Sequence, residues 1–237
     1  MIFDDKTKNE DVANAILMRA KDMGPKVNSL FFFRIASLIG TALLLFAMAA
    51  AAVAEDRGSV LGISILSVVV SLGLGIGYSI VVINLGQYYE EFKTAGICYL
   101  VQAILSALVS ISGFRILQIP AAVLSLVYIF NFAEAMKQSL YLIDTKTADG
   151  WDSLILGYKI IFGTLIGCVL FAFIPIINIF ALVIMLLCCV GVLAIAVYEL
   201  ILLKTSANSM IRFTKGQPIN PVTRNNNTSA DSYLDRF

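Results

Sequence analysis

The stretch VLGISILSVVVSLGLGIGYSIVVINL, residues 60–85, decides the fold class of this chain because it contains no charged residue. About 20 consecutive apolar residues are enough for an α-helix to cross the hydrocarbon core of a bilayer. Lipid cannot pair with backbone N–H and C=O groups, so a single spanning segment of this kind must be helical. The stretch therefore predicts a transmembrane helix.

Five further apolar runs resemble it, which makes the expected fold class an all-α integral membrane protein with six transmembrane helices arranged as three hairpins. The domain expected to cross the membrane is residues 30–203, preceded by a polar arm (1–29) and followed by a polar, flexible tail (204–237). The expected spans are Leu30–Ala54, Val60–Leu85, Ile97–Phe114, Ile116–Phe132, Leu154–Ile174 and Ile176–Leu203.

The distribution of positive charge orients these spans. Of the 17 Lys and Arg residues, all but two lie in, or at the edge of, one alternate set of gaps between the runs, and Arg57 and Arg115 lie in the other set. Because Lys and Arg accumulate in cytoplasmic loops, we expect a multi-pass protein of the cell membrane with both termini in the cytoplasm. The external turns are then very short, and a soluble partner would bind on the cytoplasmic face.

The N-terminal arm contains a segment, Asn9–Met23, that predicts a short amphipathic helix ended by Gly24 and Pro25. Its basic residues are compatible with a helix lying on the inner leaflet, and equally with an arm that packs on the protein's own loops. Small residues before Ala54 resemble a signal-peptidase site. The apolar run is longer than a signal peptide's, so we expect no cleavage there, although the sequence leaves the question open.

The longest internal gap is Ala133–Ser153. Its first half is expected to continue the fourth helix beyond the membrane. The residues Ala148–Gly150 predict a turn, and Trp151 is expected to anchor the chain at the membrane interface.

Composition excludes several classes of function. The chain is 59% hydrophobic and 14% charged, and it has no histidine, the commonest general base and metal ligand. Its 4 cysteines lie in apolar runs and are expected to be reduced and buried. We therefore expect no enzyme, no metal, no cofactor and no nucleic-acid partner.

Charged residues within the runs are few. Arg34, Glu134, Lys159 and Glu199 all lie near an expected cytoplasmic end, where long side chains reach the interface at low cost. The centre of the membrane then carries no charge, which argues against a proton relay.

Two polar side chains lie deeper in the spans, Gln102 and Asn178. Each is expected either to bridge helices by hydrogen bonds or to line a small polar cavity. Two glycine pairs, Gly73/Gly77 and Gly163/Gly167, have the small-xxx-small spacing that lets helices pack closely, within one chain or between copies. A hinge in a transporter is the other interpretation of these glycines.

Tyr78, Tyr128 and Tyr198 lie near the cytoplasmic ends of the even-numbered spans, where tyrosines commonly anchor helices at the interface. A faint three-hairpin repeat is the alternative. Residues at the same ends are expected to form a cytoplasmic interface: Asn84, Glu134, Glu199 and Lys204.

Two functions fit this layout. The first is a small-molecule permease or the membrane subunit of a transporter that works with a cytoplasmic partner such as an ATPase. The second is a non-catalytic scaffold or assembly protein that homo-oligomerises. A polar cavity reaching Gln102 or Asn178 would favour transport, whereas a tightly packed bundle without one would favour the scaffold.

Overall fold

The computed structural model describes residues 3–54, 57–171 and 175–217, with side chains described for residues 12–217 apart from 52, 55–57 and 169–182. This part of the chain is helical and contains no strand. Its elements are α1 (Phe3–Val53), α2 (Arg57–Leu85), α3 (Glu90–Ser112), the short 3₁₀ helix η1 (Arg115–Leu117), α4 (Gln118–Leu140), α5 (Thr145–Phe171) and α6 (Pro175–Thr214).

Six of these helices are long and apolar enough to cross a membrane, as the sequence predicts. Large apolar side chains cover their outer surfaces: Phe46 on α1 is 76% exposed and Ile111 on α3 is 75% exposed. Such surfaces are unfavourable in water and favourable in lipid. The fold therefore indicates a multi-pass membrane protein.

The helices form a closed ring. Each helix packs against the next one along the chain, and α6 returns to pack against α1. Contacts between the three expected hairpins are as extensive as contacts within them. The hairpin arrangement therefore stays a prediction, because no pair of helices stands apart as a separate unit.

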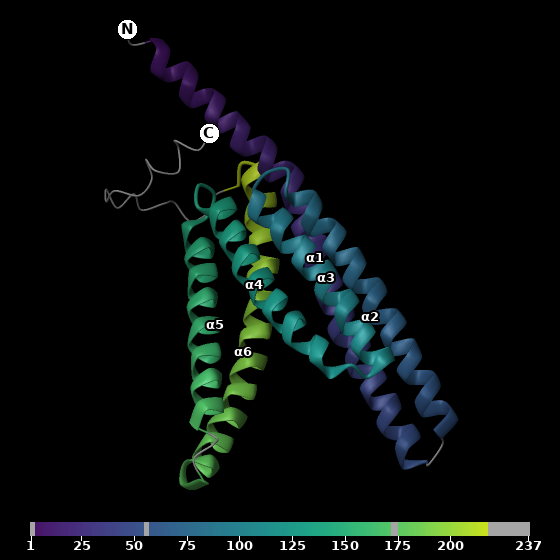
Figure 1. The fold of residues 1–237 in the computed structure, drawn as a ribbon. Helices are drawn as coiled ribbons and strands as arrows, with labels where there is room; N and C mark the ends of the chain where they lie inside the picture. Colours follow the sequence, from purple (N-terminus) through teal and green to yellow (C-terminus); the bar gives the residue numbers. More distant parts are fainter. Residues whose placement is uncertain (1–2, 55–56, 172–174, 218–237) are drawn as a thin grey trace.

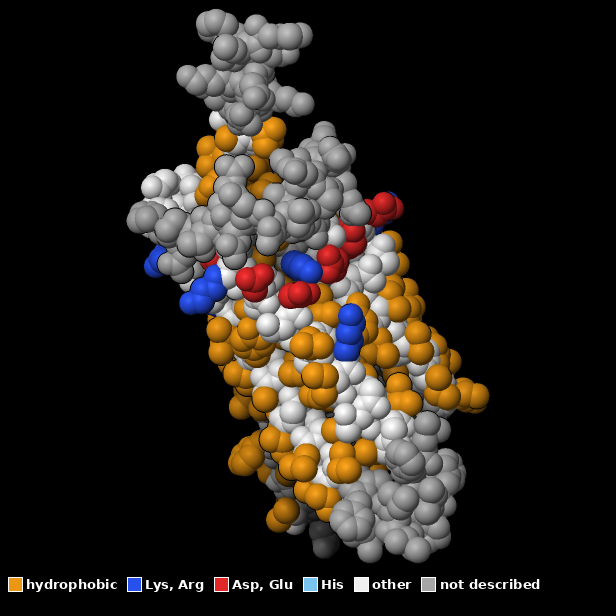
Figure 2. Space-filling model, turned by 90° about the vertical axis from the view of Figure 1, so that its left-hand side faces the viewer, with side chains coloured by type: hydrophobic (Ala, Val, Ile, Leu, Met, Phe, Trp, Pro, Cys, Tyr) orange, Lys and Arg blue, Asp and Glu red, His pale blue; other side chains and the backbone are white. Residues whose placement is uncertain are grey.

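The two ends of the ring differ. We call the end that holds the start of α3, the α4–α5 connection and the end of α6 the charged end. Acidic and basic side chains gather there, while apolar side chains cover the surface below it (Figure 2). From the charged end the helices diverge, so that α5 and α6 separate from α1, α2 and α3 towards the opposite end (Figure 1).

The hydrophobic core lies towards the charged end. Its largest buried side chains are no more than 2% exposed and come from every one of the six helices: Met23, Leu30, Tyr78, Leu85, Phe92, Tyr128, Phe132, Met136, Leu140, Trp151, Leu203 and Met210. The charged end is therefore the part of the bundle that packing holds together most firmly.

The predicted end of the N-terminal helix at Gly24 and Pro25 is wrong, because α1 continues through both residues. A proline inside a helix removes one backbone hydrogen bond, at a cost of about 3 kcal/mol. Packing offsets this cost: Met23 and Val27 are buried on either side of the proline. Gly24 lets α6 come close, since a Cβ there would lie 3.2 Å from Cγ1 of Ile211.

The apolar side chains of this segment face the protein. Ala20, Met23, Val27 and Leu30 recur at helical spacing and all belong to the core. The face that an interfacial helix would turn to lipid is therefore occupied by α6 for this part of α1. The short amphipathic helix expected before the first span does not exist as a separate element in the described chain.

The predicted turn at Ala148–Gly150 is also wrong. The fourth helix does continue, to Leu140, but the connection that follows is short and α5 already begins at Thr145. Asp144 caps α5, because its carboxylate accepts a hydrogen bond from the backbone N–H of Thr147 at 3.2 Å. An aspartate at this position starts a helix three residues before the expected turn.

Trp151 does not anchor the chain at the interface. It is fully buried in the core, and its indole Nε1–H donates a hydrogen bond to Oγ of Ser206 at 2.9 Å. Ser206 lies on α6, which runs to Thr214 and so extends well into the segment expected to be a flexible tail. Packing of Ala207 and Met210 in the core explains this extension.

Candidate functional site

An ion pair between the first and last helices lies inside the ring. Arg34 on α1 donates from Nη2 to Oε1 of Glu199 on α6 at 3.0 Å, and also to the hydroxyl of Tyr128 at 2.9 Å. The two charged side chains are only 24% and 11% exposed. The expectation that Arg34 and Glu199 reach separately to the interface is therefore wrong: each is stabilised by the other within the protein.

Tyrosine rings surround the guanidinium of Arg34. Its central carbon lies 4.9 Å from the ring centre of Tyr78, 5.5 Å from that of Tyr99 and 5.6 Å from that of Tyr128. These distances are in the range of cation–π attraction. The hydroxyls of Tyr78 and Tyr128 share a hydrogen bond of 2.6 Å. On the other side of the ion pair, Tyr158 donates a long bond of 3.4 Å to Oε2 of Glu199.

These residues form the Arg34 cluster: Arg34, Tyr78, Tyr99, Tyr128, Tyr158 and Glu199. Each comes from a different one of the six helices. Tyr78 and Tyr128 are each 2% exposed, so they are part of the core and do not anchor the helices at an interface. The cluster is the one place where polar interactions connect the whole ring among the described residues.

A polar cleft begins beside the cluster. It lies among α1, α2 and α3 and has a volume of about 290 Å³. We call it the serine cleft because five serines line it, together with Tyr99 of the Arg34 cluster. The full lining is Ser37, Ser67, Val68, Ser71, Leu72, Gly75, Tyr99, Gln102, Ala103, Ser106, Ala107 and Ser110.

Gln102 lines this cleft, as one of its two predicted roles requires. Its side-chain oxygen Oε1 is buried and has no hydrogen-bond partner among the described residues. A buried polar oxygen without a partner is costly, so it is expected to be met by water or by a bound solute. The side chain of Asn178, the other deep polar residue, lies outside the described residues.

The predicted glycine pairs fall into two groups. A Cβ on Gly77 would lie 2.9 Å from the ring of Phe33, so this glycine permits close packing of α1 on α2. No described atom lies within 4 Å of a Cβ added at Gly73, Gly163 or Gly167. Their roles in packing or bending stay predictions.

The predicted cytoplasmic interface is divided as well. Lys204 donates to Oδ1 of Asn28 at 3.1 Å and lies over the ring of Phe31, so it links α6 to α1. Glu134 pairs with Lys137 at 4.0 Å and accepts a hydrogen bond from Gln138 at 3.4 Å, both on its own helix. Asn84 is exposed. Glu134 and Asn84 are therefore accessible at the charged end, whereas Glu199 and Lys204 are used inside the bundle.

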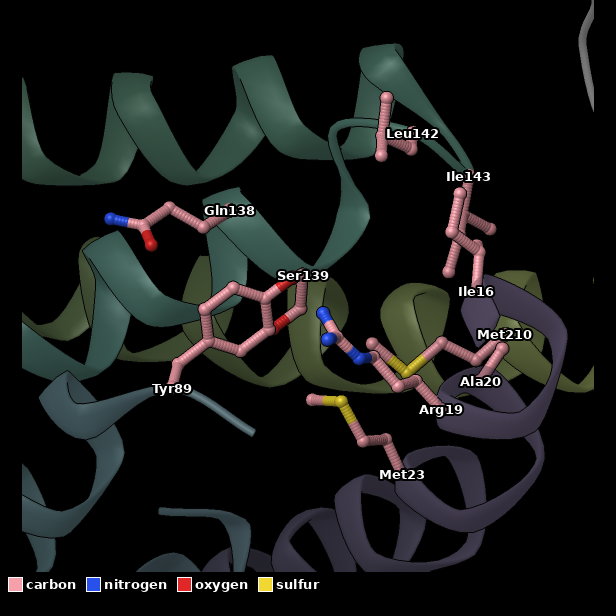
Figure 3. Close-up of a pocket in the computed structure, with 10 residues that line it drawn as sticks. All are labelled: Ile16, Arg19, Ala20, Met23, Tyr89, Gln138, Ser139, Leu142, Ile143 and Met210. Carbon is pink, nitrogen blue, oxygen red and sulfur yellow. The ribbon is translucent and has the colours of Figure 1, made fainter. Parts of the chain in front are cut away.

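A smaller pocket lies among α1, α4, α6 and Tyr89, where Arg19 reaches towards Tyr89 and Ser139 (Figure 3). Its volume of about 20 Å³ suits one water molecule. Burial raises the pKa of Tyr89 above its ordinary value, although the nearby charge of Arg19 lowers it in part. The pocket is too small for a substrate.

A larger cleft of about 440 Å³ lies at the charged end, between the start of α5 and the end of α6. Asp144, which lies in it, also accepts a hydrogen bond from Ser209 at 2.6 Å. Burial acts to raise the pKa of Asp144, but the bonds from Ser209 and Thr147 outweigh it, so the pKa falls below its ordinary value. Asp144 is therefore ionised at neutral pH.

Sequence reasoning did not find Tyr99 or Tyr158, and it did not pair Arg34 with Glu199. A signal was available: two opposite charges within otherwise apolar spans are each costly alone, and pairing lowers that cost. Among the described residues no group of three His, Cys, Asp or Glu side chains is placed to hold a metal ion. No protein-family model, no curated protein and no solved structure matches this chain.

Proposed function

We propose that the chain is a permease of the cell membrane for a small, uncharged polar solute, with the serine cleft as its solute path. The observation that carries this proposal is the polar cleft that reaches Gln102, in a segment that otherwise faces lipid. A scaffold has no need of a polar void at this depth, where unpaired polar groups are costly.

The chemistry of the cleft supports an uncharged solute. Its lining contains hydroxyl and amide groups and no charged side chain. Serine hydroxyls in helices commonly donate to the carbonyl one turn back, as Ser110 does to Ser106 at 2.9 Å, and they keep lone pairs for a solute. The buried oxygen of Gln102 offers an acceptor for a solute N–H or O–H.

The Arg34 cluster would act as the gate of this path. It closes the cleft towards the charged end, and Tyr99 belongs to both. Since its members come from all six helices, a solute passes only if helices move apart there. The arrangement resembles no proton relay, because Glu199 is held by Arg34. Movement of the solute would therefore follow its gradient or be driven by a cytoplasmic partner such as an ATPase.

Proteoliposomes test the proposal. The purified chain is reconstituted, and swelling is followed by stopped-flow light scattering with urea, glycerol and erythritol as solutes. The chain should raise the permeability to at least one of them. Ser71→Leu with Ser106→Leu fills the cleft and should abolish the increase. Thr164→Leu, which replaces a partly exposed residue on α5 outside the cleft, should leave the increase unchanged.

Two results would overturn the proposal. One is a permeability equal to that of empty vesicles for every solute, with the chain shown to be folded by its sedimentation and circular dichroism. The other is an increase that the cleft-filling variant retains, since the solute path would then lie elsewhere.

The second candidate is a scaffold that forms homo-oligomers. It is supported by Gly163 and Gly167 on α5, because no atom of the described residues lies within 4 Å of a Cβ added at either glycine. A second helix could approach closely there. Gly163→Ile with Gly167→Ile should lower the mass measured by light scattering in detergent if this candidate is correct, and should leave it unchanged if the chain acts as a single copy.

The proposal includes the orientation, with the charged end and both termini in the cytoplasm. Cysteines introduced at Gly216 and at Gly113 lie at opposite ends of the bundle. In intact cells a membrane-impermeant maleimide should label Gly113→Cys and not Gly216→Cys. The reverse pattern would contradict the orientation without affecting the transport test.

A further inference from the structure

The cleft at the charged end has features that the proposed path does not use. It lies between α5 and α6, away from the serine cleft, and its lining is Asp144, Lys146, Thr147, Gly150, Tyr198, Leu202, Thr205, Asn208, Ser209 and Arg212. Gly150 keeps the two helices close, since a Cβ there would lie 2.7 Å from Cδ2 of Leu202. The hydrogen bond from Ser209 to Asp144 holds the start of α5 against α6.

Its positive charges have no partner in the described chain. Lys146 and Arg212 are both exposed, and neither forms an ion pair with a described carboxylate. Asp144, the acidic residue of the lining, has both carboxylate oxygens occupied by donors from Thr147 and Ser209. The lining therefore carries two cations against one carboxylate, and its cations are available to an anion.

The rest of the lining is suited to lipid. Leu202 and Tyr198 continue the cleft along α6 towards the middle of the bundle. Beside them α6 has an apolar surface, with Ile201 56% exposed and Val197 56% exposed. A cationic rim above an apolar wall, at the boundary between charged and apolar surface, matches the shape of a phospholipid better than that of a free phosphate ion. Basic pockets between transmembrane helices on the cytoplasmic side recognise such headgroups.

We propose that this cleft binds an anionic phospholipid of the cytoplasmic leaflet. Lys146 and Arg212 hold its phosphate, Asn208 donates a hydrogen bond to the headgroup, and the acyl chains lie along Tyr198 and Leu202. The site joins α5 to α6 at the end where packing holds the ring together, so the lipid acts as a clamp on this pair of helices.

Native mass spectrometry of the full chain in detergent tests the site. Phosphatidylglycerol and phosphatidylcholine are added in turn at equal concentrations, and bound lipid is counted. The wild-type chain should retain phosphatidylglycerol in preference to phosphatidylcholine. Each cation near a membrane surface contributes about 1 kcal/mol to the binding of an anionic lipid, so Lys146→Gln with Arg212→Gln should weaken binding about thirtyfold.

A matched control removes the same charge elsewhere. Lys93 and Lys159 are exposed and lie outside the cleft. The variant Lys93→Gln with Lys159→Gln should bind phosphatidylglycerol like the wild-type chain. Equal losses in the two double variants would show that net charge alone attracts lipid, and would overturn the site.

Two further arms use the wild-type chain, so they do not depend on a variant that folds. Equal retention of phosphatidylcholine and phosphatidylglycerol would overturn the preference for an anionic lipid. Glycerol 3-phosphate added in excess should not displace the lipid; complete displacement would identify a soluble phosphate compound as the ligand and overturn the phospholipid. None of these outcomes bears on the permeability test of the serine cleft.

Discussion

The charged end and the opposite end of this bundle are built from the same helices but held together differently. At the charged end, buried aromatic side chains, the Arg34 cluster and the Trp151–Ser206 hydrogen bond join all parts of the ring. Towards the opposite end the helices diverge and turn apolar side chains outward (Figure 1). Composition therefore makes every helix suitable for lipid, whereas a small set of contacts at one end decides how the helices meet.

Removal of one member of the ion pair between Arg34 and Glu199 should have the largest effect on the charged end. Glu199→Leu leaves Arg34 buried and unpaired, and should lower the free energy of unfolding by roughly 3–5 kcal/mol. This free energy is measured by unfolding the full chain with sodium dodecyl sulfate in mixed micelles. The control is Lys26→Met, which removes an exposed ion pair with Asp22 and should lower the free energy of unfolding by less than about 1 kcal/mol.

The double variant Arg34→Met with Glu199→Leu sharpens the same test. It removes both charges and should recover most of the lost stability, because no unpaired charge remains. A Glu199→Leu variant as stable as the wild-type chain would mean that the pair does not hold the ring together.

A pair of glycine substitutions compares the tightly packed charged end with an open helix surface further along the bundle. In Gly96→Ala, the new Cβ would lie 2.6 Å from Cγ1 and 2.8 Å from the backbone nitrogen of Ile83, so it should lower the free energy of unfolding by roughly 1–3 kcal/mol. In Gly73→Ala, no described atom lies within 4 Å of the new Cβ, and alanine should stabilise the helix by roughly 0.5–1 kcal/mol. The same micelle titration measures both. Effects of the same sign on the free energy of unfolding would contradict tight packing at Gly96 and open space at Gly73.

Ser206→Ala tests the hydrogen bond that joins α5 to α6 in the core. It leaves the indole N–H of Trp151 buried without an acceptor, at an expected cost of about 1–3 kcal/mol. Thr205→Ala, next to it on an exposed face, removes only a hydroxyl that bonds to its own helix and is the control. Equal costs for the two variants would argue against this bond.

The smallest expected effect is a dependence of stability on pH that is caused by the titration of Asp144. Its pKa is lower in the folded chain than in the unfolded chain, so its contribution is fully present above the unfolded pKa and is lost as pH falls through the folded pKa. Asp144→Asn should therefore reduce the loss of stability on acidification. The free energy of unfolding of both chains is measured by the micelle titration at neutral pH and at pH values near and below the ordinary aspartate pKa. Identical pH profiles for the two chains would contradict this role of Asp144.

Much of the fold was predictable because lipid imposes simple rules on sequence. Six apolar runs predicted six helices, and six helices of the structure are long and apolar enough to cross a membrane. Predictions of where helices end were less successful. Gly24 and Pro25 do not end α1, because packing against α6 outweighs the local cost of the proline, and local signals do not reveal such packing.

The candidate site was predictable only in part. Gln102 was found because a polar side chain within an apolar run is conspicuous. The Arg34 cluster was missed because each of its residues, judged alone, has an ordinary explanation at a membrane interface. The positions of Tyr78 and Tyr128 in the sequence are compatible with an aromatic belt at the interface and equally with the core. Only the packing of the six helices shows that both tyrosines belong to the core.

The helical structure of the chain, its six segments able to cross a membrane and its asymmetric charges all follow from the length and polarity of each segment in the sequence. Which polar residues meet depends on the way the helices pack. Arg34 and Glu199 are 165 residues apart in the chain, yet they pair at 3.0 Å because α6 closes the ring against α1. Pairing between distant segments depends on how helix surfaces pack, and no local pattern of residues encodes that packing.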